Sequence, residues 1–362
     1  MTTPSQTLPT LLDVARLADV STATVSRALN KPQAVRADLR ARVQTAVASL
    51  GYVANAGARA MTLRRSGTVG VVVPTIDNAI FANGLQSFQS TMAARGYHVL
   101  LAFSDYDPEQ EMAQVKNLLA RGVDALALTG LSQLPPLLDL LSQRGLPWVH
   151  TGSYPARSGL ACVGFRNREA MAQAVRYLME LGHQNIAMLA GITRNNDRAS
   201  ERVEAVRLAL RGTRLTLTGG RLVEAAYAIP AAREGARVLL AQADRATAIV
   251  CGNDVLAYGL LLECQAQGIA VPAQLSVVGF DDLDLSRHWQ PGLTTMHVPT
   301  ELMWERAANY LVDRMELRLS APQQLEVAVE LIVRGSTGPP AGQAPETPRK
   351  RRSARAVPVP RR

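Results

Sequence analysis

Two short segments near the N-terminus, separated by a three-residue break, constrain the fold of this chain more than any other feature. In both segments apolar residues recur at the i, i+3, i+4 spacing: Val14, Leu17 and Ala18, then Val25, Ala28 and Leu29. Each segment is therefore predicted to be a helix with one buried face. The break is Asp19-Val20-Ser21, and Ser21 is the type of residue that caps a helix beginning at Thr22.

The predicted solvent face of the second helix combines small, hydroxyl, amide and guanidinium side chains: Thr22, Ala23, Ser26, Arg27 and Asn30. Such side chains can approach base edges or phosphates in a DNA major groove. Two short amphipathic helices could equally open an ordinary helical domain. A third periodic segment, from Asp38 to Leu50 with Gly51 as its stop, favours a closed three-helix unit that reads DNA.

The motifs of this region resemble those of one family. Asp13 to Asn30 follow the pattern D-V-A-x-x-A-G-V-S-x-x-T-V-S-R-x-L-N, with Asp19 in place of the usual glycine. Asn55, Ala58, Arg59 and Met61 then follow N-x-x-A-R-x-L, with Met61 in place of leucine. In these motifs the chain resembles the lactose-repressor/galactose-repressor (LacI/GalR) family of bacterial transcriptional regulators. Aspartate tolerates a left-handed backbone better than most residues, so we expect the turn to survive.

The resemblance implies which residues face DNA. In the headpiece they are Thr10, Ser21, Thr22, Ala23, Ser26, Arg27 and Asn30, and in the hinge helix they are Asn55, Arg59 and Met61. The hinge leucine of the family wedges into the minor groove; methionine is a more flexible apolar wedge. The third helix also departs from the family, because Arg36 stands where a capping serine or threonine is usual.

Positive charge is confined to the two ends of the chain. Residues 1–66 hold nine lysines and arginines against three aspartates, a net charge of +6. The segment from Thr337 holds seven against one glutamate, again +6, whereas the whole chain is +9, so the middle is −3. This distribution suits phosphate binding by the headpiece. Residues 338–362 are basic and proline-rich and are expected to be disordered, either as a DNA-affinity arm or as a solvated extension.

Several classes of protein do not fit the sequence. No apolar run reaches membrane-spanning length and residues 1–9 lack the layout of a secretory signal, so we expect a cytoplasmic, nucleoid-associated protein. Cys162, Cys251 and Cys264 lack metal-site spacing and are expected to be buried, reduced thiols. The chain contains no phosphate loop, G-x-S-x-G, H-E-x-x-H or G-x-G-x-x-G motif. We expect no cofactor, no metal and no enzyme activity.

From Val69 onward short apolar runs alternate with helical periodicity, which predicts parallel sheets covered on both faces. The runs are 69–73, 98–103, 125–128, 148–150, 186–189, 248–250 and 276–279. The resemblance implies the periplasmic-binding-protein fold. The expected fold class is thus an all-α helix-turn-helix headpiece followed by a two-lobed α/β periplasmic-binding-protein-like core with parallel sheets. The expected domains are a headpiece (1–54), a hinge (55–67), a core (68–337) and the tail (338–362). Within the core we expect a first lobe of 68–164 and 296–337 and a second lobe of 165–295.

Ligands bind beyond the carboxyl ends of parallel strands, so a cleft is expected between the lobes. By family position, the effector site consists of Ile80, Phe81, Arg202, Asn253 and Asp281, with Arg166 at its mouth. Arginine and carboxylate suit a polyhydroxylated ligand such as a sugar. The alternatives are a surface ion pair for Arg202, a loop cap for Asp281 and a solvent-facing Arg166.

Two departures from the family modify this expectation. Gly152 and Arg166 stand where the family often has aspartate, which makes the cleft more positive and favours a sugar acid or phosphorylated sugar. The expected protein is a repressor that binds a palindromic operator as a homodimer under control of such an effector. A small-molecule enzyme or an exported solute-binding protein on the same cleft are the alternatives.

Overall fold

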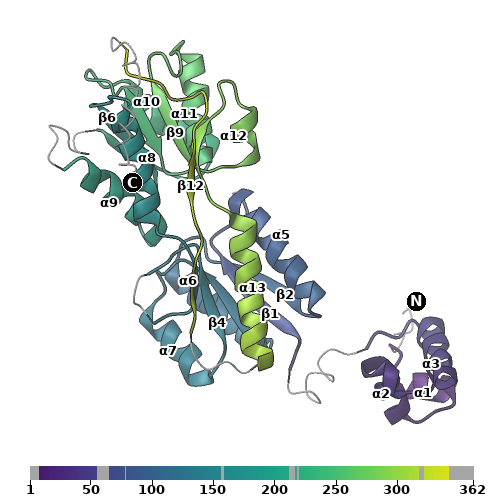
Figure 1. The fold of residues 1–362 in the computed structure, drawn as a ribbon. Helices are drawn as coiled ribbons and strands as arrows, with labels where there is room; N and C mark the ends of the chain where they lie inside the picture. Colours follow the sequence, from purple (N-terminus) through teal and green to yellow (C-terminus); the bar gives the residue numbers. More distant parts are fainter. Residues whose placement is uncertain are drawn as a thin grey trace, which may run out of the picture. The chain divides into compact units, whose positions relative to one another are not determined.

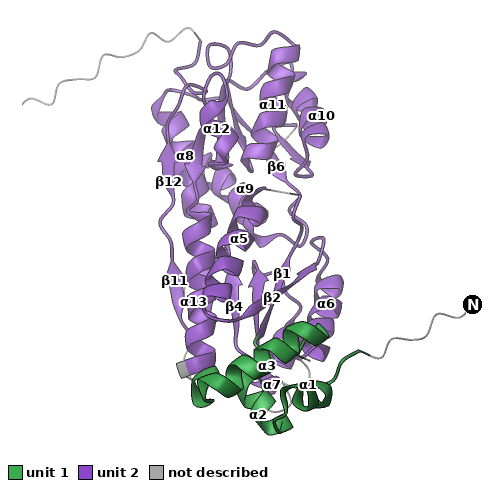
Figure 2. Cartoon of the chain, turned by 90° about the vertical axis from the view of Figure 1, so that its right-hand side faces the viewer, with its two compact units in different colours: residues 1–67 green, residues 68–362 purple. Residues whose placement is uncertain are grey.

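The computed structural model of the protein describes residues 8–54, 65–77, 79–155, 159–211, 217, 220–317 and 322–341. The chain divides into two compact units, Met1–Gly67 and Thr68–Arg362, which are coloured separately in Figure 2. The predicted hinge contacts Asn55, Arg59 and Met61 lie outside the described residues, as does the tail from residue 342. Among the described residues, no helix is both long enough and apolar enough to cross a membrane.

The described residues of the first unit form three α-helices and a short 3-10 helix: α1 (Leu11–Ala18), α2 (Thr22–Asn30), η1 (Pro32–Ala34) and α3 (Ala37–Leu50). Its small core forms around Val14, Val25 and Val43, which are fully buried. The three helices predicted from periodicity are thus confirmed. The expected burial of Leu17 is wrong, because its side chain is 55% exposed and Ala15 is buried on that helix instead.

Local hydrogen bonds define the turn between α1 and α2. Asp19 adopts a left-handed backbone (φ 50°) and ends α1, as expected for the position usually occupied by glycine. Arg42 of α3 holds this turn, since its Nη2 donates to the Asp19 carbonyl oxygen at 2.9 Å and to its carboxylate at 3.0 Å. The Ser21 hydroxyl then accepts a hydrogen bond from the Thr24 N–H at 3.1 Å and so caps α2, as predicted.

The second unit has two lobes, each built on a six-stranded sheet (Figure 1). The first sheet has the order β11-β5-β4-β3-β1-β2, and its strands all pair in parallel. They are β1 (Thr68–Val73), β2 (His98–Phe103), β3 (Ala125–Thr129), β4 (Trp148–Thr151), β5 (Cys162–Gly164) and β11 (Gln324–Glu326). The helices of this lobe are α5 (Ala79–Ala94), α6 (Pro108–Ala120), α7 (Pro135–Arg144) and α13 (Thr300–Leu317).

The second sheet has the order β12-β10-β9-β8-β6-β7, and only its edge strand β12 runs antiparallel among the described pairs. Its strands are β6 (Ile186–Gly191), β7 (Leu222–Ala225), β8 (Ala248–Cys251), β9 (Ser276–Asp281), β10 (Thr294–His297) and β12 (Glu330–Ile332). The helices are α8 (Asn167–Glu180), α9 (Asp197–Ala209), α10 (Ile229–Leu240), α11 (Asp254–Ala266) and α12 (Asp284–His288). Cys162, Cys251 and Cys264 are all buried and free.

The expected lobe boundaries need correction. Residues 296–337 are not all in the first lobe, because β10 and β12 pair within the second sheet. The chain returns to the first lobe after His297, at the start of α13, and re-enters the second lobe between β11 and β12. Gly338, expected to begin the disordered tail, is held by the Ser276 hydroxyl: its N–H donates to Oγ at 3.0 Å.

Candidate functional site

The predicted DNA-facing residues of the headpiece, all of them described, lie on α2 and at the starts of α1 and α2. Thr22, Ala23, Arg27 and Asn30 are exposed, and Ser26 is partly exposed. Asn30 donates through Nδ2 to the Ser26 carbonyl oxygen at 2.9 Å, so these two residues share one side of the helix. Thr10 and Ser21 are the N-caps of α1 and α2. Within α2 itself there is no acidic side chain.

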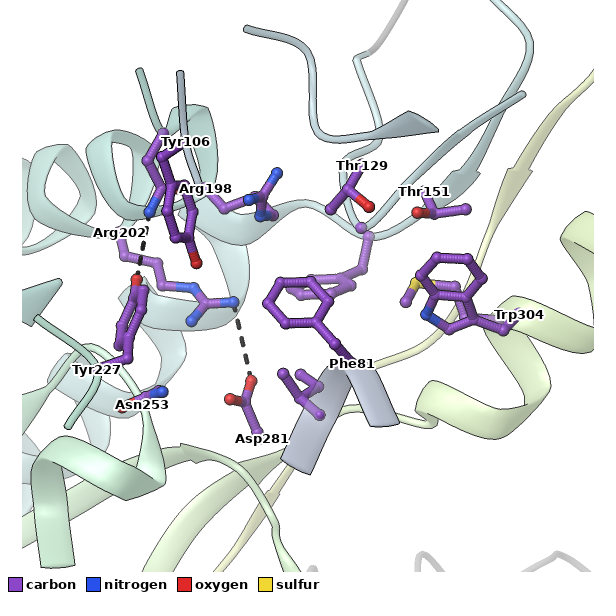
Figure 3. A pocket seen from close by; sticks show the side chains of 15 residues that line it. Phe81, Tyr106, Thr129, Thr151, Arg198, Arg202, Tyr227, Asn253, Asp281 and Trp304 are labelled. Atoms are coloured by element: carbon purple, nitrogen blue, oxygen red, sulfur yellow. Dashed lines mark hydrogen bonds and ion pairs between the residues drawn. The ribbon is translucent and has the colours of Figure 1, made fainter. Parts of the chain in front are cut away.

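A pocket lies between the two lobes of the second unit, with an empty space of about 560 Å³ that includes its opening (Figure 3). One wall is apolar and the opposite side is polar. The apolar wall is formed by Ile80, Phe81, Phe165, Met303 and Trp304. The polar side chains are those of Tyr106, Thr129, Thr151, Asn196, Arg198, Arg202, Tyr227, Asn253 and Asp281. Five of the six predicted effector residues are thus brought together: Ile80, Phe81, Arg202, Asn253 and Asp281.

Arg202 is buried, with 6% of its surface exposed, and its donors are directed at fixed partners. Its Nε donates to Asn167 Oδ1 at 2.9 Å, and its Nη1 donates to the Gly252 carbonyl oxygen at 2.6 Å. Its guanidinium carbon stacks 3.7 Å from the centre of the Phe280 ring. The side chain is therefore held rigidly at the floor of the pocket, and the surface ion pair considered as its alternative is excluded.

Asp281 faces Arg202 but is only loosely paired with it. Its Oδ1 lies 3.9 Å from Arg202 Nη2, and this buried oxygen has no hydrogen-bond partner among the described residues. Burial raises the pKa of Asp281 to about 8 in spite of Arg202, and burial also lowers the pKa of Arg202. Asp281 therefore presents a buried oxygen that a ligand's hydrogen-bond donor can satisfy.

Two tyrosines from opposite lobes face each other at the polar side of the pocket. Tyr106 follows β2 and Tyr227 follows β7, and their ring centres are 6.3 Å apart. Tyr106 is held in a left-handed conformation (φ 60°), directly after Asp105 at φ 49°. Neither tyrosine was predicted from the sequence, since both belong to loops whose side-chain directions no periodicity defines.

Arg166 does not line the pocket. Its Nε donates to Glu326 at 3.0 Å and its Nη1 donates to Glu169 at 3.2 Å, and its side chain is 36% exposed. It also stacks over the Tyr154 ring, 5.2 Å from the ring centre. The expectation that Arg166 stands at the mouth of the pocket is therefore wrong. Its position agrees with the alternative, in which the side chain faces solvent.

Arg198 is the charged pocket residue that the sequence analysis missed. It belongs to α9 of the second lobe, and its side chain is 13% exposed. Gly152, predicted to make the cleft more positive by the loss of a carboxylate, lies against it: a Cβ at residue 152 would stand 3.3 Å from Arg198 Cδ. The positive charge at this end of the pocket thus comes from Arg198 rather than Arg166.

Comparisons with known proteins agree with this architecture. Residues 10–55 match the family of bacterial regulatory proteins of the lacI family, and residues 175–337 match the periplasmic binding protein-like domain. The HTH-type transcriptional repressor CytR of Escherichia coli (strain K12) is 32% identical, over 92% of this chain and 97% of its own length. The HTH-type transcriptional repressor PurR of Escherichia fergusonii is 30% identical, over 91% of this chain and 97% of its own.

Solved structures are also similar over most of the chain. A lac repressor dimer bound to operator and the anti-inducer ONPF is 25% identical, covering 92% of this chain and 100% of that one, with a TM-score of 0.80. The complex of the transcriptional regulator CelR with cellobiose is 29% identical, covering 91% and 99%, with a TM-score of 0.66. With its helix-turn-helix unit, its two-lobed α/β unit and these relatives, the chain belongs to the LacI family, and it is a DNA-binding transcriptional repressor, not an enzyme.

Proposed function

We propose that this repressor binds a palindromic operator as a homodimer and that a small, sugar-like effector in the pocket between the lobes controls its operator affinity. The DNA contacts are assigned to Thr10, Ser21, Thr22, Ala23, Ser26, Arg27 and Asn30 and, in the hinge, to Asn55, Arg59 and Met61. Two copies are needed because one headpiece buries too little surface for strong sequence specificity.

The charge and exposure of the first unit support the DNA-binding half of this proposal. The exposed side chains of α2 include hydroxyl, amide and guanidinium groups that can donate hydrogen bonds to bases and phosphates, without an opposing carboxylate on the helix. The net charge of +6 over residues 1–66 provides the nonspecific attraction to the phosphate backbone.

The unpartnered oxygen of Asp281 is the single observation that carries the effector half. A buried carboxyl oxygen without a partner is unfavourable unless a ligand donates a hydrogen bond to it. Phe81 and Trp304 oppose it with an apolar wall, so that one face of a sugar ring can lie on aromatic surface while hydroxyl groups reach Asp281. The similar regulator CelR was solved with cellobiose, which also favours a sugar.

An effector of this kind controls DNA binding only through its different affinities for two arrangements of the core. Such coupling is typically worth ~1–3 kcal/mol, or roughly a 5- to 150-fold change in operator affinity. The pocket is formed by both lobes, so its occupation favours one arrangement of the lobes over another. The change would reach DNA through the hinge expected at residues 55–67.

The test is an operator titration in the presence of sugars. Fluorescence anisotropy of a labelled operator duplex would be measured with full-length protein and a panel of neutral sugars, sugar acids and sugar phosphates. At least one compound should change operator affinity within the range above. Asp281→Ala should remove this response while retaining operator binding. Asp284→Ala is the matched control, because Asp284 is an exposed carboxylate of the next helix with 88% side-chain exposure. An unchanged response in Asp281→Ala would refute the pocket assignment.

A further inference from the structure

We propose that Arg198 selects an effector that carries an anionic group, a carboxylate or a phosphate, on a small polyhydroxylated body. This inference rests on the proposed function, and it assigns the anion to a residue of α9 rather than to Arg166 or Arg202. These arginines differ in the number of N–H donors that remain for a ligand.

Arg202 already uses two of its five donors. Its Nε and Nη1 are engaged by Asn167 and by the carbonyl of Gly252, and its Nη2 points to Asp281. The face of its guanidinium is covered by the Phe280 ring. The Nη2 donors that remain lie beside Asp281, so an anion bound to them would face this carboxyl group, and the donors at Nε and Nη1 could be taken only by displacing Asn167 and the Gly252 carbonyl. Arg202 is therefore best understood as the residue that orients the pocket floor.

Arg198 has donors available. A guanidinium carries five N–H donors, and within the described part of the chain that of Arg198 makes one hydrogen bond, from Nη1 to Asp197 Oδ1 at 3.2 Å. Figure 3 shows this guanidinium between Tyr106 and Thr129, at the polar end of the pocket. Burial acts against its charge, but Asp197 and the neighbouring tyrosines more than offset burial, so the pKa of Arg198 is raised.

Two glycines of the first lobe make room for Arg198. Gly130 follows β3 and Gly152 follows β4, and both have a positive φ (73° and 83°). A Cβ on Gly130 would overlap the Arg198 guanidinium, and one on Gly152 would press on its Cδ at 3.3 Å. The side chain of one lobe is thus inserted between two loops of the other, where an effector in the pocket can contact it.

The remaining charges around the pocket leave it with a positive balance. Asp197 is the counter-ion of Arg198, and its other oxygen accepts a hydrogen bond from Ser153 Oγ at 2.6 Å. Glu111 does not line the main pocket but a neighbouring cavity, to which Arg198 also contributes. Asp281, the carboxyl group inside the main pocket, is shifted by burial towards its protonated form. An anionic ligand would therefore add the charge that this pocket lacks, and a carboxylate or phosphate matches the fork of a guanidinium.

The same contacts connect the anion to the arrangement of the lobes. Besides the bond from Ser153, the backbone N–H of Asp197 donates to Ser132 Oγ at 3.1 Å, so the start of α9 is tied to two loops of the first lobe. An anion bound to Arg198 lies next to these ties. We therefore expect the anionic group to affect lobe closure as well as affinity.

The test compares matched neutral and anionic compounds. Isothermal titration calorimetry of the full-length protein would use D-glucose with D-glucuronate and D-glucose 6-phosphate, D-galactose with D-galacturonate, D-glucitol with D-gluconate, and inorganic phosphate alone. At least one anion should bind about tenfold or more tightly than its neutral partner, a difference of about 1.4 kcal/mol. The carboxylate and phosphate compounds distinguish the two anionic groups.

Variants assign the preference to its residue. Arg198→Gln should reduce the anion preference to about threefold or less, whereas Arg198→Lys should retain part of it because the charge remains. Arg166→Gln is the control and should leave the preference unchanged, since Arg166 is paired with Glu169 and Glu326 outside the pocket. Tryptophan fluorescence and thermal unfolding would establish that each variant is folded.

Three results would overturn the role of Arg198. In the first, the wild-type protein binds neutral compounds as tightly as their anions. In the second, the anion preference survives in Arg198→Gln. In the third, no anion binds, inorganic phosphate included. A neutral sugar that changes operator affinity while all anions are inert would leave the proposed function standing and would exclude Arg198 alone.

Discussion

Replacing Asp281 by asparagine should remove the pH dependence of stability of the second unit between pH 6.5 and pH 8. The pKa of Asp281 is raised from 3.8 to about 8 by burial. Within this interval the carboxyl group is ionised in the unfolded chain and protonated in the folded one. The folded state then binds one more proton, so stability falls as the pH rises. One proton corresponds to about 1.4 kcal/mol per pH unit, which gives a loss of about 2 kcal/mol over the interval.

Other buried groups change the free energy of unfolding mainly below pH 6.5, which is why the interval begins there. The pKa of His150 is lowered by burial from 6.5 to about 4, so its effect, a gain in stability with rising pH, is mostly complete by pH 6.5, and only a small further gain follows as the unfolded imidazole loses its proton. His183 also shifts downwards from 6.5, again through burial. Burial raises the pKa of Asp254 from 3.8 to about 6, so its loss of stability is nearly complete before the interval begins.

The assay is urea denaturation of the effector-free protein, followed by tryptophan fluorescence at several pH values. Trp148, Trp289 and Trp304 are the three tryptophans of the chain and all belong to the second unit, so unfolding of the first unit is not recorded. Asparagine has nearly the shape of aspartate and tolerates the positive φ of 111° at this position. If Asp281→Asn loses stability with pH as steeply as the wild type, Arg202 keeps Asp281 ionised and the reasoning is wrong.

Further predictions concern the first unit. Ser21→Ala should lower its stability by about 1 kcal/mol through loss of the α2 cap, measured by thermal unfolding monitored by far-ultraviolet circular dichroism; an unchanged transition would mean that the hydroxyl is dispensable. Arg42→Ala should destabilise the turn at Asp19, and Asp19→Gly in the same chain should restore most of the loss, because glycine needs no support in a left-handed conformation; equal stability of the single and double variants would contradict this. Arg27→Ala should weaken operator binding by ~1–3 kcal/mol with little effect on random DNA if Arg27 contacts a guanine, and equal losses on both would make it a phosphate contact.

The regular elements could be predicted where burial creates a repeating local pattern. All seven predicted apolar runs lie within strands of the structure, because strands covered on both faces need continuous apolar sequence. The strands that escaped prediction are short and lie at or near sheet edges. β11, for example, consists of Gln324, Leu325 and Glu326, and only pairing with β5 identifies it as a strand.

The pocket was predictable only in part, because its side chains come from distant segments and no local sequence pattern brings them together. Family position located Asp281 and Arg202, but the partners that fix Arg202 come from distant segments. Arg198 lies in the first turn of α9, where the polar sequence is typical of an exposed helix. It is buried because the loops at Gly130 and Gly152 enclose it. Arg166 is the opposite case: its pairing with Glu169, three residues along the chain, was visible in the sequence, whereas the pairing with Glu326 was not.

Sequence-specific recognition of DNA by a dimer is tested by affinity selection of genomic fragments with the full-length protein at near-physiological salt. We expect enrichment of a sequence with two-fold symmetry whose half-sites are separated by a whole number of DNA turns. Arg27→Ala should lose this enrichment at defined positions of each half-site. Uniform, salt-sensitive enrichment of all fragments would mean that the basic ends of the chain bind phosphate alone, and it would exclude sequence-specific binding by this repressor.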